Sequence, residues 1–469
     1  MHYHLIGICG TAMASLAGML QARGHRVTGS DQNVYPPMST QLEGLGIEII
    51  NGYKAENADT GADLTIVGNT ISRGNPELEE VLNRKLQYCS QAETVKEEFI
   101  RGRRSLVVAG THGKTTTTSI ATWIAEVGGL NPSFLVGGIV QNFGASFRVT
   151  DSDYFVIEGD EYDTAYFDKK PKFMHYLPEI AIVNNIEFDH ADIYDNLDDI
   201  KFEFSRLMNL VPGNGHLIVG IDSPVVREVL EEMKGKIFTN VETFGTCEDA
   251  KWQARYIDFS GETTRFTVFK DGYSWSEFET SLIGEFNVRN CLAVIIAANA
   301  WGISKEIINE AFRTFKSVKR RVEVRGVERG VTVIDDFAHH PTAVEETLKA
   351  LKQKYAGRRL IAVFEPRSWS SRLAIFQKPY TKAFNYADYV IIAGVYNTSK
   401  ASELGKVLDT PELVKDIGLQ GKPSYSFPDA DSIVEHLTSK LEEGDVVAFM
   451  SNGGFGGIHD KMLNILREK

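Results

Sequence analysis

The chain has 469 residues, of which 43% are hydrophobic and 24% charged, as is typical of a globular protein. This length is too great for a single hydrophobic core, so we expect several domains. The formal net charge of −13 disfavours non-specific binding to nucleic acid or anionic lipid, and we expect neither as a partner.

The cysteines and the first residues indicate a cytoplasmic protein. The four cysteines have neither the spacing of a metal site nor that of a disulfide framework, which suits a reducing compartment. They are Cys9, Cys89, Cys247 and Cys291. The chain begins with an apolar strand rather than the basic start of a signal peptide, and it has no apolar run long enough to span a membrane.

Residues 1 to about 100 alternate apolar strands with a helix. Gly24 suits the C-terminal end of that helix, where glycine readily takes the left-handed backbone conformation. This alternation predicts a parallel sheet with helices on both faces. The predicted elements are a strand at 4–8, a helix at 11–21 and strands at 26–31 and 62–67.

A second block, residues 101–318, continues the same alternation. Its basic start, Arg101-Gly102-Arg103-Arg104, is either a linker or a strand edge. Residues 253–283 alternate polar and apolar side chains in short runs, which predicts a small antiparallel sheet before the next helix. The other predicted elements are strands at 105–109, 154–158 and 180–184 and helices at 115–127 and 288–300.

A third block, residues 319–469, predicts another doubly wound α/β unit because its apolar strands again alternate with helices. The predicted strands are 331–335, 360–364, 389–393 and 446–450.

The strongest functional signal is Gly110-Thr111-His112-Gly113-Lys114-Thr115-Thr116, between a predicted strand and a predicted helix. Backbone N–H groups at such a turn form a concave anion site, and the helix dipole adds positive potential. Lys114 would contact the terminal phosphates of ATP, and the Thr115 hydroxyl would contact Mg²⁺. The common form, Gly-x-x-x-x-Gly-Lys-Ser/Thr, has more residues between its glycines.

Acidic residues and a histidine follow two later strands. Glu158 ends one strand and begins an acidic run that reaches Asp163, and His190 follows the next strand. Ligands of open parallel sheets bind at the carboxyl ends of strands, so Glu158 and His190 are candidate metal ligands beside Thr115. Histidine is an unusual ligand for Mg²⁺, and a solvated acidic loop is the alternative for each segment alone.

The loop Gly7-Ile8-Cys9-Gly10-Thr11-Ala12-Met13 occupies the position of a dinucleotide fingerprint, with Asp31 at the end of the second strand. It lacks the third glycine of that pattern. A helix N-terminus here can hold a diphosphate, and Ser30 or Asp31 can hydrogen-bond a ribose or base. An NAD-dependent oxidoreductase is an alternative, but it leaves the Lys114 loop unexplained.

The third block carries Asp335-Asp336-Phe337-Ala338-His339-His340-Pro341 at the end of a strand. These acids and histidines suit a functional cleft that faces the nucleotide. The alternative is a purely structural role, in which an aspartate caps the following helix and the two histidines face solvent. Arg367 follows the next strand and could bind a carboxylate through two hydrogen bonds. The glycine-rich segment 451–457 either approaches a ligand or forms a tight turn.

The order of these motifs resembles that of the Mur ligase family over nearly the whole chain, including its short Gly-x-x-Gly-Lys-Thr-Thr loop. The resemblance implies an α/β protein of three domains. A Rossmann-like N-terminal domain binds a uridine nucleotide, a P-loop ATPase central domain carries the small antiparallel sheet, and a Rossmann-like C-terminal domain brings the incoming amine. The implied boundaries are 1–100, 101–318 and 319–469.

The resemblance also implies roles for individual residues. The implied catalytic residues are Lys114, Glu158, His190 and Asp336, and the implied metal ligands are Thr115, Glu158 and His190. ATP contacts are implied for residues 110–116 and for Asn287, Asn290, Arg321 and Asp336. UDP-sugar contacts are implied for Gly7, Cys9, Gly10, Thr11, Ala12, Ser30, Asp31 and Asn69, and acceptor contacts for His339, His340 and Arg367.

Within the family, the chain most resembles the branch that joins the tripeptide L-alanyl-γ-D-glutamyl-meso-diaminopimelate to UDP-N-acetylmuramate in peptidoglycan recycling. The resemblance rests on Ile8–Met13, Tyr35-Pro36-Pro37-Met38-Ser39, Asp160–Phe167 and Met450–His459. Several other branches carry a carbamylated lysine downstream of the metal histidine. In this chain the corresponding region reads Phe204-Ser205-Arg206 and contains no lysine.

The resemblance implies an ATP-dependent, ADP-forming ligase that uses Mg²⁺ and forms an acyl-phosphate. Its partners would be small molecules, with no obligate protein partner. The first alternative is a UDP-N-acetylmuramate–L-alanine ligase, which differs in its acceptor. A non-enzymatic nucleotide-binding scaffold is another, and it predicts ATP binding without phosphate release.

Overall fold

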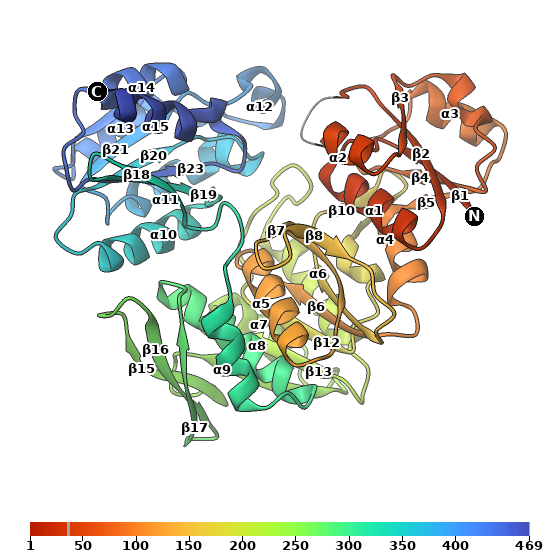
Figure 1. The fold of residues 1–469 in the computed structure, drawn as a ribbon, viewed down its shortest axis with the longest axis horizontal. Coiled ribbons are helices and arrows are strands. Elements are labelled where there is room, and N and C mark those ends of the chain that lie inside the picture. The colour runs from red at the N-terminus through yellow and green to blue at the C-terminus, as the bar shows by residue number, and fades with distance from the viewer. Residues whose placement is uncertain (35–37, 469) are drawn as a thin grey trace.

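The computed structural model of the protein describes residues 1–34 and 38–468, and these are arranged around three large sheets (Figure 1). Tyr35, Pro36 and Pro37, which helped to place the chain in its family branch, lie outside the described residues. Within the described ranges, no helix is both long and apolar enough to cross a membrane.

The N-terminal unit is a parallel sheet of five strands in the order β3-β2-β1-β4-β5. The chain runs from β1 through β2 to β3 and then crosses to β4, so β1 and β4 flank a topological switch point. The strands are β1 (His2–Ile6), β2 (Arg26–Asp31), β3 (Glu48–Asn51), β4 (Leu64–Val67) and β5 (Tyr88–Ser90). The helices are α1 (Thr11–Ala22), α2 (Met38–Gly44), α3 (Pro76–Asn83) and α4 (Gln91–Val95).

Glycines set the ends of two elements in this unit. Gly24 has φ +82° just after α1, as predicted for a helix C-terminus. The strand predicted at 4–8 instead ends at Ile6, because Gly7 has φ +85°, a conformation that an extended strand does not contain.

The central unit is a sheet of ten strands in the order β17-β16-β15-β14-β13-β12-β6-β9-β7-β8. The strands from β14 to β7 in this order are parallel, and the others extend the sheet at its two edges. The parallel strands are β6 (Arg104–Ala109), β7 (Ser133–Val140), β9 (Tyr154–Glu158), β12 (Ile180–Val183), β13 (His216–Gly220) and β14 (Asn240–Gly245). At the edges lie β8 (Ala145–Arg148), β15 (Trp252–Asp258), β16 (Thr264–Lys270) and β17 (Tyr273–Thr280).

The antiparallel strands expected at 253–283 are present, but they do not form a separate sheet. Phe244 of β14 pairs with Trp252 of β15, so β15, β16 and β17 continue the central sheet. A hairpin of β10 (Asp163–Ala165) and β11 (Asp168–Pro171) follows the acidic run.

Helices cover both faces of the central sheet because its strands are apolar on both sides. Val107 and Val108 of β6 belong to different hydrophobic clusters, one on each face. On one face lie α5 (Lys114–Val127), α8 (Glu285–Ala300) and α9 (Lys305–Thr314), and on the other α6 (Leu197–Leu210) and α7 (Pro224–Glu232).

The C-terminal unit is a sheet of six strands in the order β18-β19-β23-β20-β21-β22, parallel except for β18. Its strands are β18 (Glu323–Glu328), β19 (Val331–Asp336), β20 (Leu360–Phe364), β21 (Tyr389–Ala393), β22 (Ser424–Phe427) and β23 (Val446–Met450). Its helices are α10 (Pro341–Lys354), α11 (Gln377–Ala383), α12 (Thr398–Leu404), α13 (Thr410–Gly418), α14 (Ala430–Thr438) and α15 (Ile458–Glu468).

Candidate active site

The phosphate loop joins β6 to α5 and is fixed by the segment that follows β12. The backbone N–H groups of Thr111 and His112 donate to Asn185, at 3.1 Å to its carbonyl and 2.8 Å to its side-chain oxygen. Gly113 has φ +81°, and a Cβ there would lie 2.6 Å from Oδ1 of Asn290. Glycine is therefore required at this turn, and as N-cap residue it has no side chain to cover the first amides of α5.

Lys114 lies over this loop and is paired with Glu161. Its Nζ donates to the Gly110 carbonyl at 2.7 Å and to Glu161 Oε2 at 2.7 Å. Burial opposes the lysine charge, but Glu161, Asp160 and Glu158 outweigh it and raise the pKa of Lys114. The cation is thus held at the loop, where the phosphates of ATP would compete with Glu161 for it.

Glu161 also contacts His190, and together with Lys114 these residues form a buried charged cluster. His190 Nε2 lies 3.2 Å from Glu161 Oε1, and the Glu161 side chain is only 2% exposed. Burial lowers the pKa of His190, yet the hydrogen bond to Glu161 and the charge of Asp189 raise it to about 9. Glu161 was not among the predicted site residues; the acidic run after β9 was the signal, but nothing in it indicates which carboxylate meets Lys114.

Glu158 and Thr115 form a second cluster. The Thr115 hydroxyl donates to Glu158 Oε1 at 3.0 Å, and the Gly137 amide donates to Glu158 Oε2 at 2.8 Å. Burial raises the pKa of Glu158 despite the nearby cations, and a bound cation would reverse that effect. A carboxylate and a hydroxyl supply the oxygen ligands that Mg²⁺ prefers, so these two residues fit the ion. His190, the third predicted ligand, directs its Nε2 at Glu161, and its role in metal binding stays a prediction.

The predicted adenine contacts lie behind the phosphate loop on α8. Asn290 Nδ2 donates to Asn287 Oδ1 at 3.2 Å, and Asn287 Nδ2 donates to the Ile283 carbonyl at 2.8 Å. Both asparagines are buried, and Asn290 lies directly against Gly113. Their contact with adenine stays a prediction, while their support of the loop is visible.

Arg321 brings the C-terminal unit to the phosphate loop. Its Nη2 donates to the Thr115 hydroxyl at 3.1 Å, and its guanidinium lies 4.7 Å from the centroid of the Phe337 ring. Asp336 accepts from the Val322 amide at 2.7 Å and the Ala338 amide at 2.8 Å, and burial raises its pKa. In this arrangement Asp336 fixes the backbone next to Arg321, and a contact with ATP stays a prediction.

The three predicted acceptor residues face different neighbours. His339 Nδ1 donates to the Phe337 carbonyl at 3.0 Å, whereas His340 Nε2 donates to the Phe188 carbonyl of the central unit at 3.2 Å. The Arg367 guanidinium lies 3.8 Å from the centroid of the Tyr396 ring.

The glycine-rich segment 451–457 meets Arg367. A Cβ on Gly453 would overlap the Arg367 side chain, so a larger residue there would displace this arginine. The Ser451 hydroxyl donates to Glu365 Oε2 at 2.5 Å.

The predicted UDP-sugar residues gather at the switch point of the N-terminal sheet. Gly7, Cys9, Gly10, Thr11 and Ala12 lie between β1 and the first turn of α1, and Asn69 follows β4. The amide of Cys9 donates to Asp31 Oδ2 at 2.9 Å, so part of the Asp31 carboxylate holds this loop. The Ser30 hydroxyl is buried and has no hydrogen-bond partner among the described residues. The crevice position fits a nucleotide site, and the individual contacts stay predictions.

Comparisons with known proteins agree with this arrangement. Three family models match the chain: "Mur ligase family, catalytic domain" at residues 2–101, "Mur ligase middle domain" at 108–298 and "Mur ligase, glutamate ligase domain" at 320–453. The chain is 42% identical to the UDP-N-acetylmuramate–L-alanyl-gamma-D-glutamyl-meso-2,6-diaminoheptandioate ligase of Escherichia coli strain K12, over 100% of this chain and 99% of that protein.

Two further relatives define the range of similarity. The UDP-N-acetylmuramate–L-alanine ligase of Caldanaerobacter subterraneus subsp. tengcongensis is 34% identical, over 98% of this chain and 96% of that protein. The crystal structure of a murein peptide ligase from Psychrobacter arcticus is 35% identical, with a TM-score of 0.73 over 100% of this chain and 99% of that chain. The fold, the phosphate loop and these similarities over the whole chain lead to one conclusion: the chain belongs to the Mur ligase family.

Proposed function

We propose that this protein joins L-alanyl-γ-D-glutamyl-meso-diaminopimelate to UDP-N-acetylmuramate in an ATP-dependent, ADP-forming reaction of peptidoglycan recycling. The observation that carries the proposal is the 42% identity, over the whole chain, to a ligase whose name states these substrates. The L-alanine ligases are similar over nearly the same length but at 31–34% identity, so this alternative is less supported.

The chemistry follows from the residues around the phosphate loop. The carboxylate of UDP-N-acetylmuramate attacks the γ-phosphate of ATP, which forms an acyl-phosphate and breaks the bond to the β-phosphate, so that ADP leaves. Lys114 and the α5 N-terminus stabilise the negative charge on the phosphates. Thr115 and Glu158 would hold Mg²⁺, with His190 as a further proposed ligand, and the ion would supply additional positive charge to the phosphates. The amine of the tripeptide then attacks the acyl-phosphate, and phosphate leaves.

The C-terminal unit completes this site. Its Arg321 already contacts Thr115, so the positions of the phosphate loop and of the acceptor side are linked. We propose that His339, His340 and Arg367 contact the acceptor, and that Arg367 pairs with a peptide carboxylate. We further propose that residues 1–100, 101–318 and 319–469 bind the UDP-sugar, ATP and the acceptor, respectively.

We also propose that the protein works in the cytoplasm and needs no protein partner. The reaction consumes ATP and a uridine nucleotide, which a cell keeps in that compartment. Cys9, Cys89, Cys247 and Cys291 are free thiols, as a reducing compartment favours.

Comparing acceptors tests the proposal. Phosphate release is measured with ATP, Mg²⁺ and UDP-N-acetylmuramate, adding either the tripeptide or L-alanine, and the product is identified by mass spectrometry. We expect kcat/KM to be higher with the tripeptide. A higher value with L-alanine would assign the alternative, and phosphate release with neither acceptor would refute ligation.

A further inference from the structure

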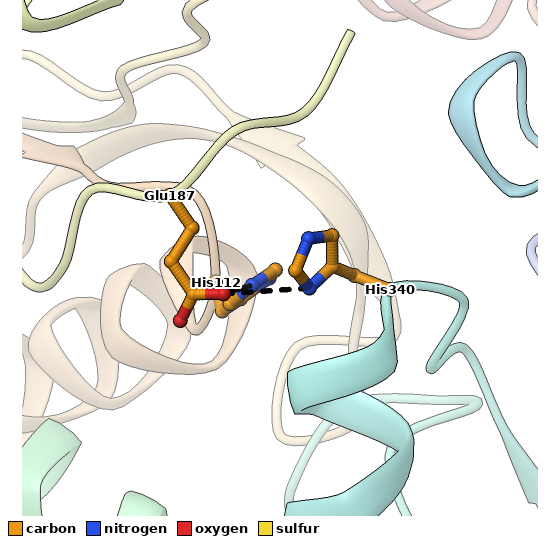
Figure 2. Close-up of side chains that lie close together, drawn as sticks. All are labelled: His112, Glu187 and His340. Atoms are coloured by element: carbon orange, nitrogen blue, oxygen red, sulfur yellow. Dashed lines mark ion pairs between the residues drawn. The ribbon is translucent and has the colours of Figure 1, made fainter. Parts of the chain in front are cut away.

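A second set of metal-binding side chains lies beside the phosphate loop, apart from Thr115 and Glu158. It consists of His112 in the loop, Glu187 after β12 and His340 at the N-cap of α10 (Figure 2). One ligand atom of each residue lies within 4.8 Å of those of the other two. Two ligands therefore come from the central unit and one from the C-terminal unit.

The spacing of these atoms suits a small transition-metal ion. Glu187 Oε2 lies 3.6 Å from His112 Nε2 and 3.5 Å from His340 Nδ1. A tetrahedral ion with bonds of about 2.0–2.1 Å separates its ligand atoms by roughly 3.3–3.4 Å. Shifts of a few tenths of an ångström in side-chain position would bring these two pairs to that separation, and the ligand atoms of His112 and His340 lie within 4.8 Å of each other.

His112 supplies an independent sign of a missing ligand. Its Nε2 is buried and has no hydrogen-bond partner among the residues that the structure describes. The distance of 3.6 Å to Glu187 is too long for a hydrogen bond. Because buried polar atoms are nearly always satisfied, this nitrogen indicates that a further group belongs between it and Glu187.

His340 is oriented for the same purpose. Its Nε2 donates to the Phe188 carbonyl at 3.2 Å, which leaves the Nδ1 lone pair facing Glu187. Carbonyl acceptors commonly orient metal-binding histidines in this way. The Thr342 amide donates to the same Nδ1 at 3.3 Å, a long contact that a metal would replace.

We propose that His112, Glu187 and His340 bind a transition-metal ion, with Zn²⁺ as the type case, and that the ion ties the phosphate loop to the C-terminal unit. Two nitrogens and one carboxylate favour such an ion over Mg²⁺, which prefers oxygen. Three protein ligands leave a fourth position for water or a solute.

The position of His340 gives the site a consequence for turnover. The set is complete only when the C-terminal unit is docked on the central unit, so the ion stabilises the docked arrangement. Turnover requires the units to separate when products leave, so the bound ion slows this step. The site thus acts as an inhibitory clamp.

Metal titration of the full-length, metal-free protein tests the site without ATP. Co²⁺ is added in the presence of excess Mg²⁺, its tetrahedral absorption bands are recorded, and Zn²⁺ is then used to displace it. We expect Glu187→Gln to weaken binding at least about tenfold. Glu158→Gln is the control that should keep the affinity, because it alters the proposed Mg²⁺ site and none of these three ligands.

Unchanged Co²⁺ affinity in Glu187→Gln would overturn the proposal, as would loss of binding in Glu158→Gln. The clamp has its own readout, which is the fraction of the ligase rate lost on adding one equivalent of Zn²⁺. For each protein the reference is its own rate with Mg²⁺ and without Zn²⁺. We expect a loss that a chelator reverses in the wild type and a smaller loss in Glu187→Gln. Equal losses in both proteins would refute the clamp.

Discussion

Glu161→Gln perturbs the charge balance at the centre of the site. The Glu161 carboxylate lies between Lys114 Nζ, at 2.7 Å, and His190 Nε2, at 3.2 Å, and its side chain is 2% exposed. Glutamine keeps the shape and can still accept hydrogen bonds, but it removes the negative charge. Lys114 and His190, whose side chains are 12% and 25% exposed, then lose their main partner.

The magnitude follows from this burial. Removing one member of a buried ion pair costs about 3–5 kcal/mol. We expect the lower end, about 3 kcal/mol, because Lys114 keeps its 2.7 Å hydrogen bond to the Gly110 carbonyl and Asp160 and Glu158 stay nearby. For a unit the size of the central one, this corresponds to a fall in Tm of roughly 6–12 °C.

ATP should partly reverse the loss. In the wild type, the phosphates must displace the Glu161 carboxylate from Lys114, whereas in the variant they supply the missing negative charge. Calorimetric unfolding with and without Mg²⁺–ATP should therefore show that ATP raises the Tm of Glu161→Gln by more than it raises the Tm of the wild type. Glu179→Gln is the control, since its partner Arg104 is exposed and the pair contributes about 1 kcal/mol or less. A Tm for Glu161→Gln equal to that of the control, with or without ATP, would refute the reasoning.

Three further predictions concern other parts of the site. Lys114→Ala should abolish ligation but leave calorimetric binding of UDP-N-acetylmuramate intact, and near-normal turnover would contradict the role of this lysine. Gly453→Ala should displace Arg367 and raise the KM for the tripeptide about tenfold, as expected for a lost charged hydrogen bond. Gly454→Ala, whose added Cβ meets no atom within 4 Å, should leave that KM unchanged. Burial opposes the charge of His190, but Glu161 and Asp189 raise its pKa to about 9. The protonated imidazole therefore stabilises the folded protein fully below pH 6.5, and this contribution is lost as the pH rises through 9. Urea unfolding below pH 6.5 and above pH 9 should show that the free energy of unfolding falls by on the order of 3 kcal/mol in the wild type and by less in His190→Gln.

Much of the fold could be predicted because its strands are buried on both faces and read as continuous apolar runs. The strands at 154–158 and 360–364 were predicted with the observed bounds. The antiparallel strands after residue 252 were also predicted, but their continuity with the central sheet was not. That continuity depends on the pairing of Phe244 with Trp252, and local periodicity carries no signal for it.

The site was predictable to the extent that topology brings residues together. Lys114 and Thr115 lie in a recognisable loop, and Glu158 ends a neighbouring strand, so their proximity follows from a parallel sheet. The pairing of Glu161 with both Lys114 and His190 depends on the fold of the loop after β9, which its sequence does not specify.

The contacts of the C-terminal unit explain why ATP binding and acceptor positioning should be linked. Arg321 contacts Thr115 of the phosphate loop, and Ser370 accepts a hydrogen bond from the Ala191 amide at 3.1 Å, next to His190. Thr342 donates to Glu187, whose own amide donates to the Thr111 hydroxyl at 2.8 Å. Each of these contacts falls on the phosphate loop or on a segment that supports it. A change in that loop on ATP binding must alter the docking equilibrium, and by linkage docking must alter ATP affinity by the same factor.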